Sequence, residues 1–225
     1  MQEQQLDEII AKYVRPKTVV SIGADILGET LLQKLSLRKE MREIQVVPTS
    51  LGIAQICSEN GIRIASLNDT EIDLAIDFVD RIDEAYNFVK TQSKSIVKDK
   101  MVAQSATELV AIAPKDAFQK RISGTVPFEV LQFGYKRTMM QLQSYGNARL
   151  REKNSEPEKT ETGNYIIDVG VSPIYSLEDL DIQTKQIPGV IETGLFIGYA
   201  DTIILHSEAG ITEKTRLEEE PPNNK

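Results

Sequence analysis

The sequence predicts an α/β protein in which a Rossmann-like domain with a parallel sheet carries an inserted small α+β (ferredoxin-like) lobe. In the first half, short β-rich runs alternate with stretches whose apolar residues recur at helical spacing, which is typical of a parallel sheet covered by helices. From Val126 onward the order becomes a β-α-β-β-α-β-like block, the order of a split β-α-β lobe. A chain of 225 residues is long enough for one sizeable core and a smaller lobe.

Apolar spacing and turn residues justify the elements of the first half. Residues 3–14 place Leu6, Ile9 and Ile10 on one helical face, and Pro16 ends this helix. The other expected elements of the first half are a strand at 18–22, a helix after Gly28 with Leu31, Leu32, Leu35 and Met41 turned inward, a strand at 44–47, a helix capped by Thr49 or Ser50 and closed by Gly61, strands at 62–65 and 72–76, a helix at 94–104 and a strand at 109–113.

The second half supplies the lobe and a return to the first sheet. The expected lobe elements are a strand at 126–132, a helix at 135–145, a strand at 165–169, a helix at 177–186 and a strand at 190–196, with a polar stretch before residue 165. A strand at 202–206 is expected to rejoin the first sheet. The predicted domains are therefore 1–125 plus 197–217 and 126–196. The charged, Pro-rich tail at 218–225 is expected to be disordered.

Composition excludes several classes of function. Lys and Arg number 26 against 34 Asp and Glu, which gives a net charge of −8 and a pI near 4.9, so a nucleic-acid partner is not expected. No run approaches about 18 consecutive apolar residues and the N-terminus has no signal-peptide pattern, so we expect a cytoplasmic protein without a membrane partner. A single cysteine, Cys57, cannot form an intramolecular disulfide, and its apolar helical surroundings indicate a core position.

Metal and histidine chemistry are also disfavoured. A structural zinc site needs about four Cys or His ligands, and Cys57 and His206 are the only such residues in the chain. His206 ends a predicted strand, where it is expected to pack or to face solvent. No nucleophile-elbow motif accompanies it. We therefore expect no metal and no cofactor.

Five segments in order carry a family resemblance. They are VPTS (47–50), the aspartate-rich IDFVDRID (76–83), VPFEV (126–130), TETGNYIID (160–168) and IPGVIETGLF (187–196). Together they resemble the ribose-5-phosphate isomerase type A family, over a match from about Leu6 to His206. The resemblance implies an aldose–ketose isomerase that interconverts ribose 5-phosphate and ribulose 5-phosphate through an enediolate, with a carboxylate base and no metal. It also implies a homodimer or homotetramer assembled partly through the small lobe.

The resemblance also assigns the site. It implies that Asp99 is the base, that Lys90 donates to the substrate oxygens, and that Asp80 helps to orient the sugar hydroxyls. Asp77 follows an apolar strand, at the sheet edge where α/β proteins bind ligands. From spacing alone, Asp77 and Asp80 would more often cap turns, and both Lys90 and Asp99 would be solvated surface residues.

Three departures from the family pattern affect this site. Thr91, Gln92 and Ser93 stand where the family has the glycines of its KGGG motif, and Asp99 stands where it has glutamate, a side chain longer by roughly 1.5 Å. The family's GTGST-like phosphate turn corresponds here to Gly23–Leu27. Asp25 in this turn would repel a phosphate by several kcal/mol at ~5 Å and an effective dielectric near 20.

The binding residues follow from these departures. Gly23 stays in the expected binding set, and Thr49 and Ser50 are the expected alternative holders of the phosphate unless the natural ligand differs. Lys115 lies near the family's second substrate lysine. One signal favours an anionic ligand: residues 87–121 carry seven basic and three acidic side chains, a net charge of +4, and Lys90, Lys94 and Lys98 share a helix face if the helix begins early.

Two alternatives to this isomerase stay open at this stage. A catalytically impaired relative would keep the fold as a sugar-phosphate-binding or assembly module. An isomerase for another sugar phosphate would keep the chemistry with a different substrate.

Overall fold

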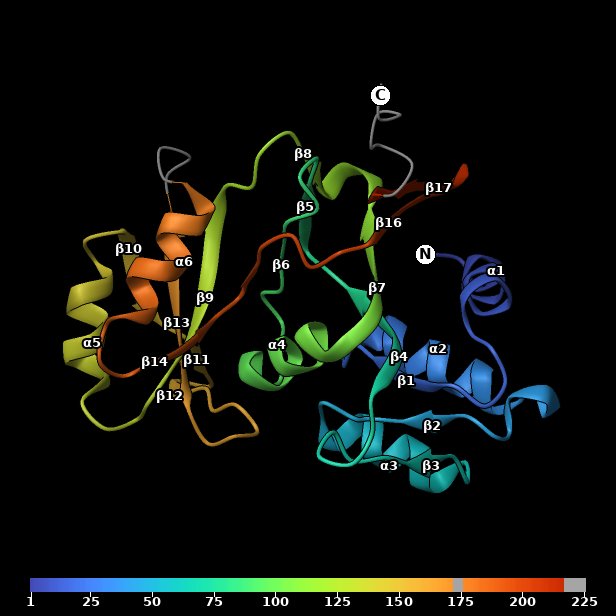
Figure 1. Cartoon of the computed structure of the whole chain (residues 1–225). Helices are drawn as coiled ribbons and strands as arrows, with labels where there is room; N and C mark the ends of the chain where they lie inside the picture. The colour runs from blue at the N-terminus through green and yellow to red at the C-terminus, as the bar shows by residue number, and fades with distance from the viewer. Residues whose placement is uncertain (172–175, 217–225) are drawn as a thin grey trace, which may run out of the picture.

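The computed structural model describes residues 1–171 and 176–216, so the predicted tail at 218–225 lies outside the described residues. The chain forms a larger body around a seven-stranded sheet and a smaller lobe beside it, drawn on the right and left of Figure 1. The lobe is an insertion, because the chain leaves the large sheet after β7 and returns to it at β16.

The large sheet has the strand order β17-β16-β7-β4-β1-β2-β3 and is parallel except for β17, which confirms the predicted Rossmann-like parallel sheet. Ser21 pairs with Ala75, and Asp77 pairs with Ala111, so β1, β4 and β7 end at the same edge. The antiparallel strand β17 is absent from the predicted elements. The bounds are β1 Val19–Ile22, β2 Gln45–Val46, β3 Arg63–Ile64, β4 Ile72–Phe78, β7 Ala106–Pro114, β16 Thr202–Ser207 and β17 Gly210–Thr215.

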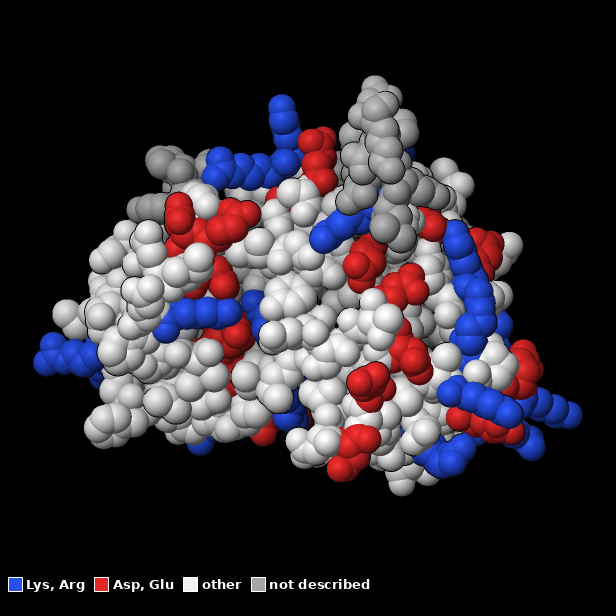
Figure 2. All heavy atoms as spheres, in the orientation of Figure 1, with Lys and Arg blue, Asp and Glu red and all other residues white. Residues whose placement is uncertain are grey.

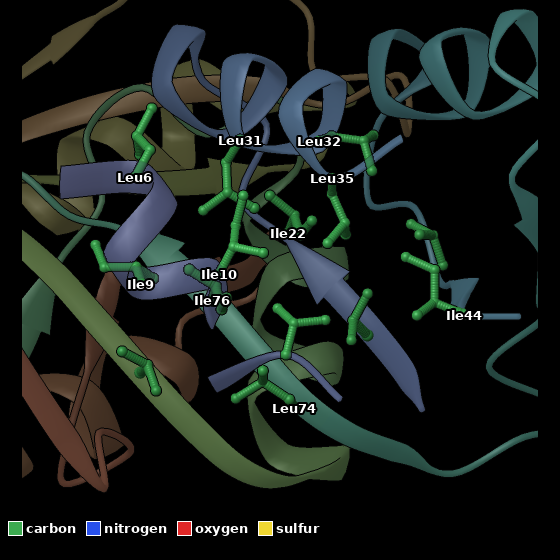
Figure 3. Packing of buried hydrophobic residues seen from close by; sticks show 14 of the residues in the cluster. Leu6, Ile9, Ile10, Ile22, Leu31, Leu32, Leu35, Ile44, Leu74 and Ile76 are labelled. Atoms are coloured by element: carbon green, nitrogen blue, oxygen red, sulfur yellow. The ribbon is translucent and has the colours of Figure 1, made fainter. Parts of the chain in front are cut away.

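Helices cover both faces of this sheet because its central strands are apolar on both sides. On one face, α1 and α2 pack against Ile22, Leu74 and Ile76 (Figure 3). On the other face, Val102 and Ala103 of α4 belong to a second apolar cluster. The bounds are α1 Glu3–Tyr13, α2 Ile26–Ser36, α3 Leu51–Glu59 and α4 Ile96–Ser105, with short 3-10 helices at Lys39–Met41 and Lys115–Ala117.

The start of α4 corrects one expectation. The helix begins at Ile96, so Lys90 and Lys94 precede it and share no helix face with Lys98. Ser95 caps this helix, because its hydroxyl accepts a hydrogen bond from the Lys98 amide at 3.4 Å.

The small lobe has an antiparallel sheet in the order β10-β13-β9-β14 with α5 and α6, which is the ferredoxin-like arrangement expected. The polar stretch before residue 165 contains β10 and a hairpin that the sequence did not reveal. Asn154 and Ser155 both have positive φ at the hairpin turn, which short polar side chains tolerate. The bounds are β9 Gly124–Val130, α5 Tyr135–Leu142, β10 Gly146–Leu150, β11 Glu152–Lys153, β12 Glu156–Pro157, β13 Tyr165–Val171, α6 Leu177–Lys185 and β14 Val190–Thr193.

A third, four-stranded sheet in the order β15-β6-β5-β8 joins the two bodies. The predicted strand at 190–196 is broken at Gly194, where a Cβ would lie 2.5 Å from Pro127 Cγ. Phe196 instead pairs with Phe88 and stacks on its ring at 4.5 Å. The Lys90 amide donates to the Gly194 carbonyl at 3.1 Å, so this sheet fixes the backbone of Lys90. The bounds are β5 Arg81–Asp83, β6 Phe88–Val89, β8 Phe118–Gln119 and β15 Leu195–Phe196.

Candidate active site

A cavity of about 330 Å³ opens at the carboxyl edge of the large sheet. This is the edge at which open α/β sheets bind ligands, because the loops that follow neighbouring strands converge there. The cavity is bordered by the loops after β1 and β4, the segment before α4, and the ends of β7 and β16. Its lining residues are Ala24, Asp25, Leu27, Asp77, Phe78, Val79, Asp80, Lys90, Gln92, Ser93, Asp99, Ile112, Pro114 and His206.

Three charged side chains meet in this cavity, and we call Asp77, Lys90 and Asp99 the ion-pair centre. Lys90 Nζ lies 2.7 Å from Asp77 Oδ1 and 2.6 Å from Asp99 Oδ2. All three side chains are at most 10% exposed. They come from three segments, the end of β4, the residue after β6 and the first turn of α4. Lys90 and Asp99 are therefore buried, and the surface alternatives raised for them are wrong.

The burial of the ion-pair centre shifts its protonation equilibria. Burial raises the pKa of Asp77 to about 6, opposed by the Lys90 ammonium and assisted by the charge of Asp99. Burial alone would lower the pKa of Lys90, but the charges of Asp77 and Asp99 outweigh it and raise that pKa. Lys90 is thus held as an ammonium ion, while Asp77 changes its charge close to neutral pH.

Gly23, at the end of β1, makes room for this centre. A Cβ at Gly23 would lie 2.3 Å from Asp77 Oδ1, which no side chain tolerates without movement of the carboxylate. The Gly23 amide donates a hydrogen bond to the Ile76 carbonyl at 2.8 Å. This bond makes the Gly23 backbone part of the sheet and restrains it from moving away from Asp77. The glycine therefore has a steric role beside Asp77.

Asp99 is fixed by its neighbours along the chain. Its Oδ2 accepts a hydrogen bond from Ser93 Oγ at 2.7 Å as well as from Lys90. Ser93 Oγ in turn accepts from the Ser95 amide at 3.1 Å. Within the described part of the chain, Asp99 Oδ1 accepts no hydrogen bond, which leaves this oxygen for a ligand.

Asp80 lines the same cavity from the loop after β4. Its Oδ2 accepts a hydrogen bond from the Thr91 amide at 2.5 Å, so it also joins this loop to the segment that follows Lys90. Arg151 of the lobe donates to the Thr91 carbonyl at 2.6 Å on the other side. Asp80 therefore both stabilises the backbone, as expected for a turn residue, and lines the cavity.

Thr49 and Ser50 lie beside the cavity without lining it. Thr49 Oγ1 is buried and has no hydrogen-bond partner among the described residues. It faces a void of about 10 Å³, which it shares with Gly23 and the ion-pair centre and which has room for about one water molecule. Ser50 Oγ caps α3 by accepting from the Ile53 amide at 3.1 Å. The void beside Thr49 is too small for a phosphate, but Thr49 also borders a separate hollow of about 270 Å³ that Lys98 lines.

The loop Gly23–Leu27, which we call the first loop, contains the residue that caps the following helix, α2. Asp25 Oδ1 accepts a hydrogen bond from the Gly28 amide at 2.6 Å, so this carboxylate is the N-cap of α2. Burial raises the pKa of Asp25. The carboxylate thus holds an amide that an anionic ligand would otherwise take, and it adds negative charge to the cavity wall.

Lys115 is placed differently from what the sequence indicates, and His206 lies at the rim of the cavity. Lys115 is exposed and borders a separate hollow near the N-terminus, outside the cavity. His206 lines the cavity, two strands away from Asp77 in the large sheet, and burial lowers its pKa. His206 is half-buried at this rim, because the carboxyl end of β16 borders the same edge as β4.

Sequence reasoning missed Glu129, a fully buried carboxylate on β9. Its Oε2 accepts from the Val97 amide at 3.0 Å, in the first turn of α4, and its Oε1 accepts from Thr160 Oγ1, Thr162 Oγ1 and Asn164 Nδ2. Through Glu129, the lobe is hydrogen-bonded to the first turn of α4, the helix that carries Asp99. The available signal was that the VPFEV and TETGN segments, noted only for the resemblance, contain all four side chains.

Other kinds of site find little support in the described residues. Across residues 1–171 and 176–216, no group of three or more His, Cys, Asp or Glu side chains is arranged to hold a metal ion. No helix in the same ranges has the length and apolar character to cross a membrane. On the face shown in Figure 2, Lys and Arg side chains lie scattered among Asp and Glu and form no continuous basic surface.

Comparison with known proteins gives a consistent result. The sequence model of ribose 5-phosphate isomerase A (phosphoriboisomerase A) matches residues 45–210. Ribose-5-phosphate isomerase A of Bacillus mycoides is 34% identical over 217 residues, which is 94% of this chain and 98% of that protein. Ribose-5-phosphate isomerase A 2 of Oceanobacillus iheyensis is 34% identical over 90% of this chain and 94% of that protein.

A solved structure agrees with these relatives. A D-ribose-5-phosphate isomerase in complex with phospho-erythronic acid superposes with a TM-score of 0.88 and 28% identity, over 94% of this chain and 96% of that one. With the sequence match, this places the chain in the ribose 5-phosphate isomerase A family.

Proposed function

We propose that this protein interconverts ribose 5-phosphate and ribulose 5-phosphate. The observation that carries the proposal is the ion-pair centre, in which a buried ammonium group lies between two carboxylates at the ligand-binding edge of the sheet. Family membership supplies the reaction, and the structure supplies a carboxylate, a cation and a cavity suited to it.

The reaction requires one proton to move between C2 and C1. Asp99 removes the C2 proton of the aldose, and the electron pair moves through C1 to the carbonyl oxygen, which gives an enediolate. A proton then transfers between the two oxygens, and the Asp99 carboxyl returns its proton to C1, which gives the ketose. Lys90 stabilises the negative oxygen, while Asp77 and Asp80 accept hydrogen bonds from sugar hydroxyls.

The oxygen of Asp99 that acts as the base is Oδ1. The other oxygen, Oδ2, is already bound by Lys90 and Ser93, which hold the carboxylate in a single orientation. Such orientation matters because a misplacement of ~1 Å can cost about 10²-fold in rate. We propose that Gly23 supports the site through Asp77, that Thr49 contacts substrate through a water molecule, and that Ser50 acts through its helix cap.

The test is an isomerase assay on purified protein, with ribulose 5-phosphate measured by a coupled enzyme. We expect Asp99→Asn to lower kcat by about 10²- to 10⁴-fold, because the amide cannot accept a proton. Asp116→Asn is the matched control, since Asp116 is exposed and outside the cavity. The proposal fails if the unaltered protein turns over no faster than Asp99→Asn. Turnover of a different sugar phosphate only would revise the substrate.

We also propose that the protein assembles as a homodimer or homotetramer, partly through the lobe. Support comes from large apolar side chains left in solvent on that lobe: Phe133 is 94% exposed and Met140 is 57% exposed. Light scattering coupled to gel filtration measures the mass, and Phe133→Glu is expected to lower it. A monomeric mass for the unaltered protein contradicts this assembly.

Two further assignments belong with this proposal. We place the protein in the cytoplasm, in line with its single, buried cysteine. We also propose domain boundaries of 1–125 plus 197–217 and 126–196. The separate lobe sheet, which runs from β9 to β14, supports these boundaries.

A further inference from the structure

We propose that Ser93 is a positioning residue for the catalytic base, and that Ser93 and Asp99 form one interdependent pair. The inference rests on the proposed function for its catalytic meaning. Its structural basis is the hydrogen bond of 2.7 Å from Ser93 Oγ to Asp99 Oδ2 in the wall of the cavity.

The direction of this hydrogen bond is fixed by a second one. Ser93 Oγ accepts the Ser95 amide proton at 3.1 Å, so its own proton is free to point at Asp99. Ser95 is also the cap of α4, and the Asp99 amide donates to the Ser95 carbonyl at 3.1 Å. The three residues therefore form a closed turn in which the hydroxyl and the carboxylate have one relative position.

The pairing explains how a short carboxylate serves at this position. The Asp99 side chain is 4% exposed, and its Oδ2 already lies within hydrogen-bond distance of both Lys90 and Ser93. One further methylene would move the carboxylate by roughly 1.5 Å, into space that these groups occupy. A glycine at position 93 would open that space and would remove the hydroxyl. Ser93 and Asp99 thus fit one another. Glutamate at position 99 does not fit beside Ser93, and glycine at position 93 leaves Asp99 without its hydroxyl donor.

The experiment is a cycle of four proteins: unaltered, Ser93→Gly, Asp99→Glu and the double variant. We expect Ser93→Gly to lower kcat about tenfold, because a hydrogen bond to a charged group is lost, with KM changed less than about twofold. We expect Asp99→Glu to lower kcat by about 10²-fold. The double variant is expected to lose far less than the product of these factors, and Ser93→Thr, which keeps the hydroxyl, to retain most of the activity.

Thr91→Gly is the matched control. It adds a glycine to the same segment, but the Thr91 side chain does not line the cavity. Combined with Asp99→Glu, it is expected to give no recovery. Losses that simply multiply in the Ser93/Asp99 double variant, or an unchanged kcat in Ser93→Gly, overturn the proposal.

Thermal unfolding of the same four proteins separates this inference from the proposed function. The Tm of the double variant is expected to lie above the value obtained by adding the two single shifts, because the two positions share one space. Additive shifts overturn the pairing even in a protein without turnover. Absence of turnover in the unaltered protein, with coupled Tm shifts, rejects only the isomerase assignment.

Discussion

The two sides of the cavity handle negative charge in opposite ways. On one side, Asp77 and Asp99 share the Lys90 ammonium group, so two buried carboxylates are balanced by a cation in direct contact. On the other side, Asp25 forms no ion pair with any described residue, and its carboxylate is bound to a helix amide instead. The ion-pair centre depends on groups from three segments, whereas the Asp25 carboxylate depends only on the helix that it caps.

This difference shows which side can vary. Replacement of one member of the ion-pair centre leaves the others with unbalanced buried charge, a cost of several kcal/mol. A change at Asp25 needs only another side chain that caps α2. Position 25 can therefore differ from the family's phosphate turn while the centre keeps the residue types that the chemistry needs.

The largest expected effect comes from Lys90→Met, which removes the cation of the ion-pair centre. Two buried carboxylates would then face one another, so we expect the free energy of unfolding to fall by about 3–5 kcal/mol at neutral pH. We also expect kcat to fall by at least about 10²-fold through loss of the donor to the enediolate. Urea unfolding and the isomerase assay measure the two effects. Lys120→Met, at an exposed position, is the control.

The second effect tests whether the backbone of the first loop supports the centre. Gly23→Ala would place a Cβ within 2.3 Å of Asp77 Oδ1, and the displaced carboxylate is expected to cost roughly 10²-fold in kcat/KM. Gly52→Ala is the matched control, since its Cβ would lie 3.4 Å from the nearest side-chain atom. Equal activities of the two variants would show that the Asp77 carboxylate can move away from a Cβ at position 23 without loss of function, which contradicts this prediction.

The third effect is a dependence on pH that arises from Asp77. Its pKa is raised by burial from an ordinary value of 3.8 to about 6, so between these values the folded protein binds a proton that the unfolded chain does not. The stability contributed by this group is present below about pH 4 and is lost as pH rises through about 6. Activity runs the other way, because kcat/KM is expected to fall about tenfold per unit below pH 6 as Asp77 is neutralised.

Measurement of both curves checks this opposition. Asp77→Asn should remove the inflection near pH 6 from the kcat/KM profile and flatten the dependence of Tm on pH over the same range. An acid limb that keeps its midpoint in Asp77→Asn would assign the titration to another group.

The smallest effect is expected on the other side of the cavity. Asp25→Ser keeps an N-cap oxygen for the Gly28 amide but removes a negative charge from the wall. We expect KM for ribose 5-phosphate to fall about three- to tenfold, with kcat unchanged, because the phosphate dianion is repelled less. Lys115→Ala, outside the cavity, is expected to change neither parameter by more than about twofold. An unchanged KM in Asp25→Ser would place the phosphate far from the first loop.

Most of the fold was predictable because it follows from apolar periodicity, which neighbouring residues determine. The parallel strands around Val20 and Ile76 and the helix with Leu31 and Leu35 could be predicted in this way. The short strands β5 and β6 could not, because they are too short to show a periodic pattern and each also pairs with a distant segment. Strand β10 was hidden by its polar residues, since only its pairing with β13 identifies it.

The site residues also divide into those that local sequence predicts and those that depend on contacts between distant segments. Asp77 could be placed at the sheet edge from the apolar strand before it. The contacts of Ser93 and Glu129 depend on how the turn before α4 folds and on how the lobe meets that helix, and both depend on tertiary structure. His206 reaches the cavity only because β16 lies beside β7, although 92 positions separate His206 from its partner Pro114.

The insertion of the lobe between β7 and β16 has a consequence for folding kinetics. Pairing of these strands closes a chain loop of about 90 residues, and the entropy of closure grows with loop length. In the folded lobe, the Gly194 amide donates to the Pro127 carbonyl at 2.7 Å, so the two ends of the insertion lie next to each other. A lobe that folds first shortens the effective loop about fourfold and lowers the closure cost by roughly 1 kcal/mol. Where the lobe folds before β7 and β16 pair, completion of the large sheet and assembly of the ion-pair centre are therefore faster.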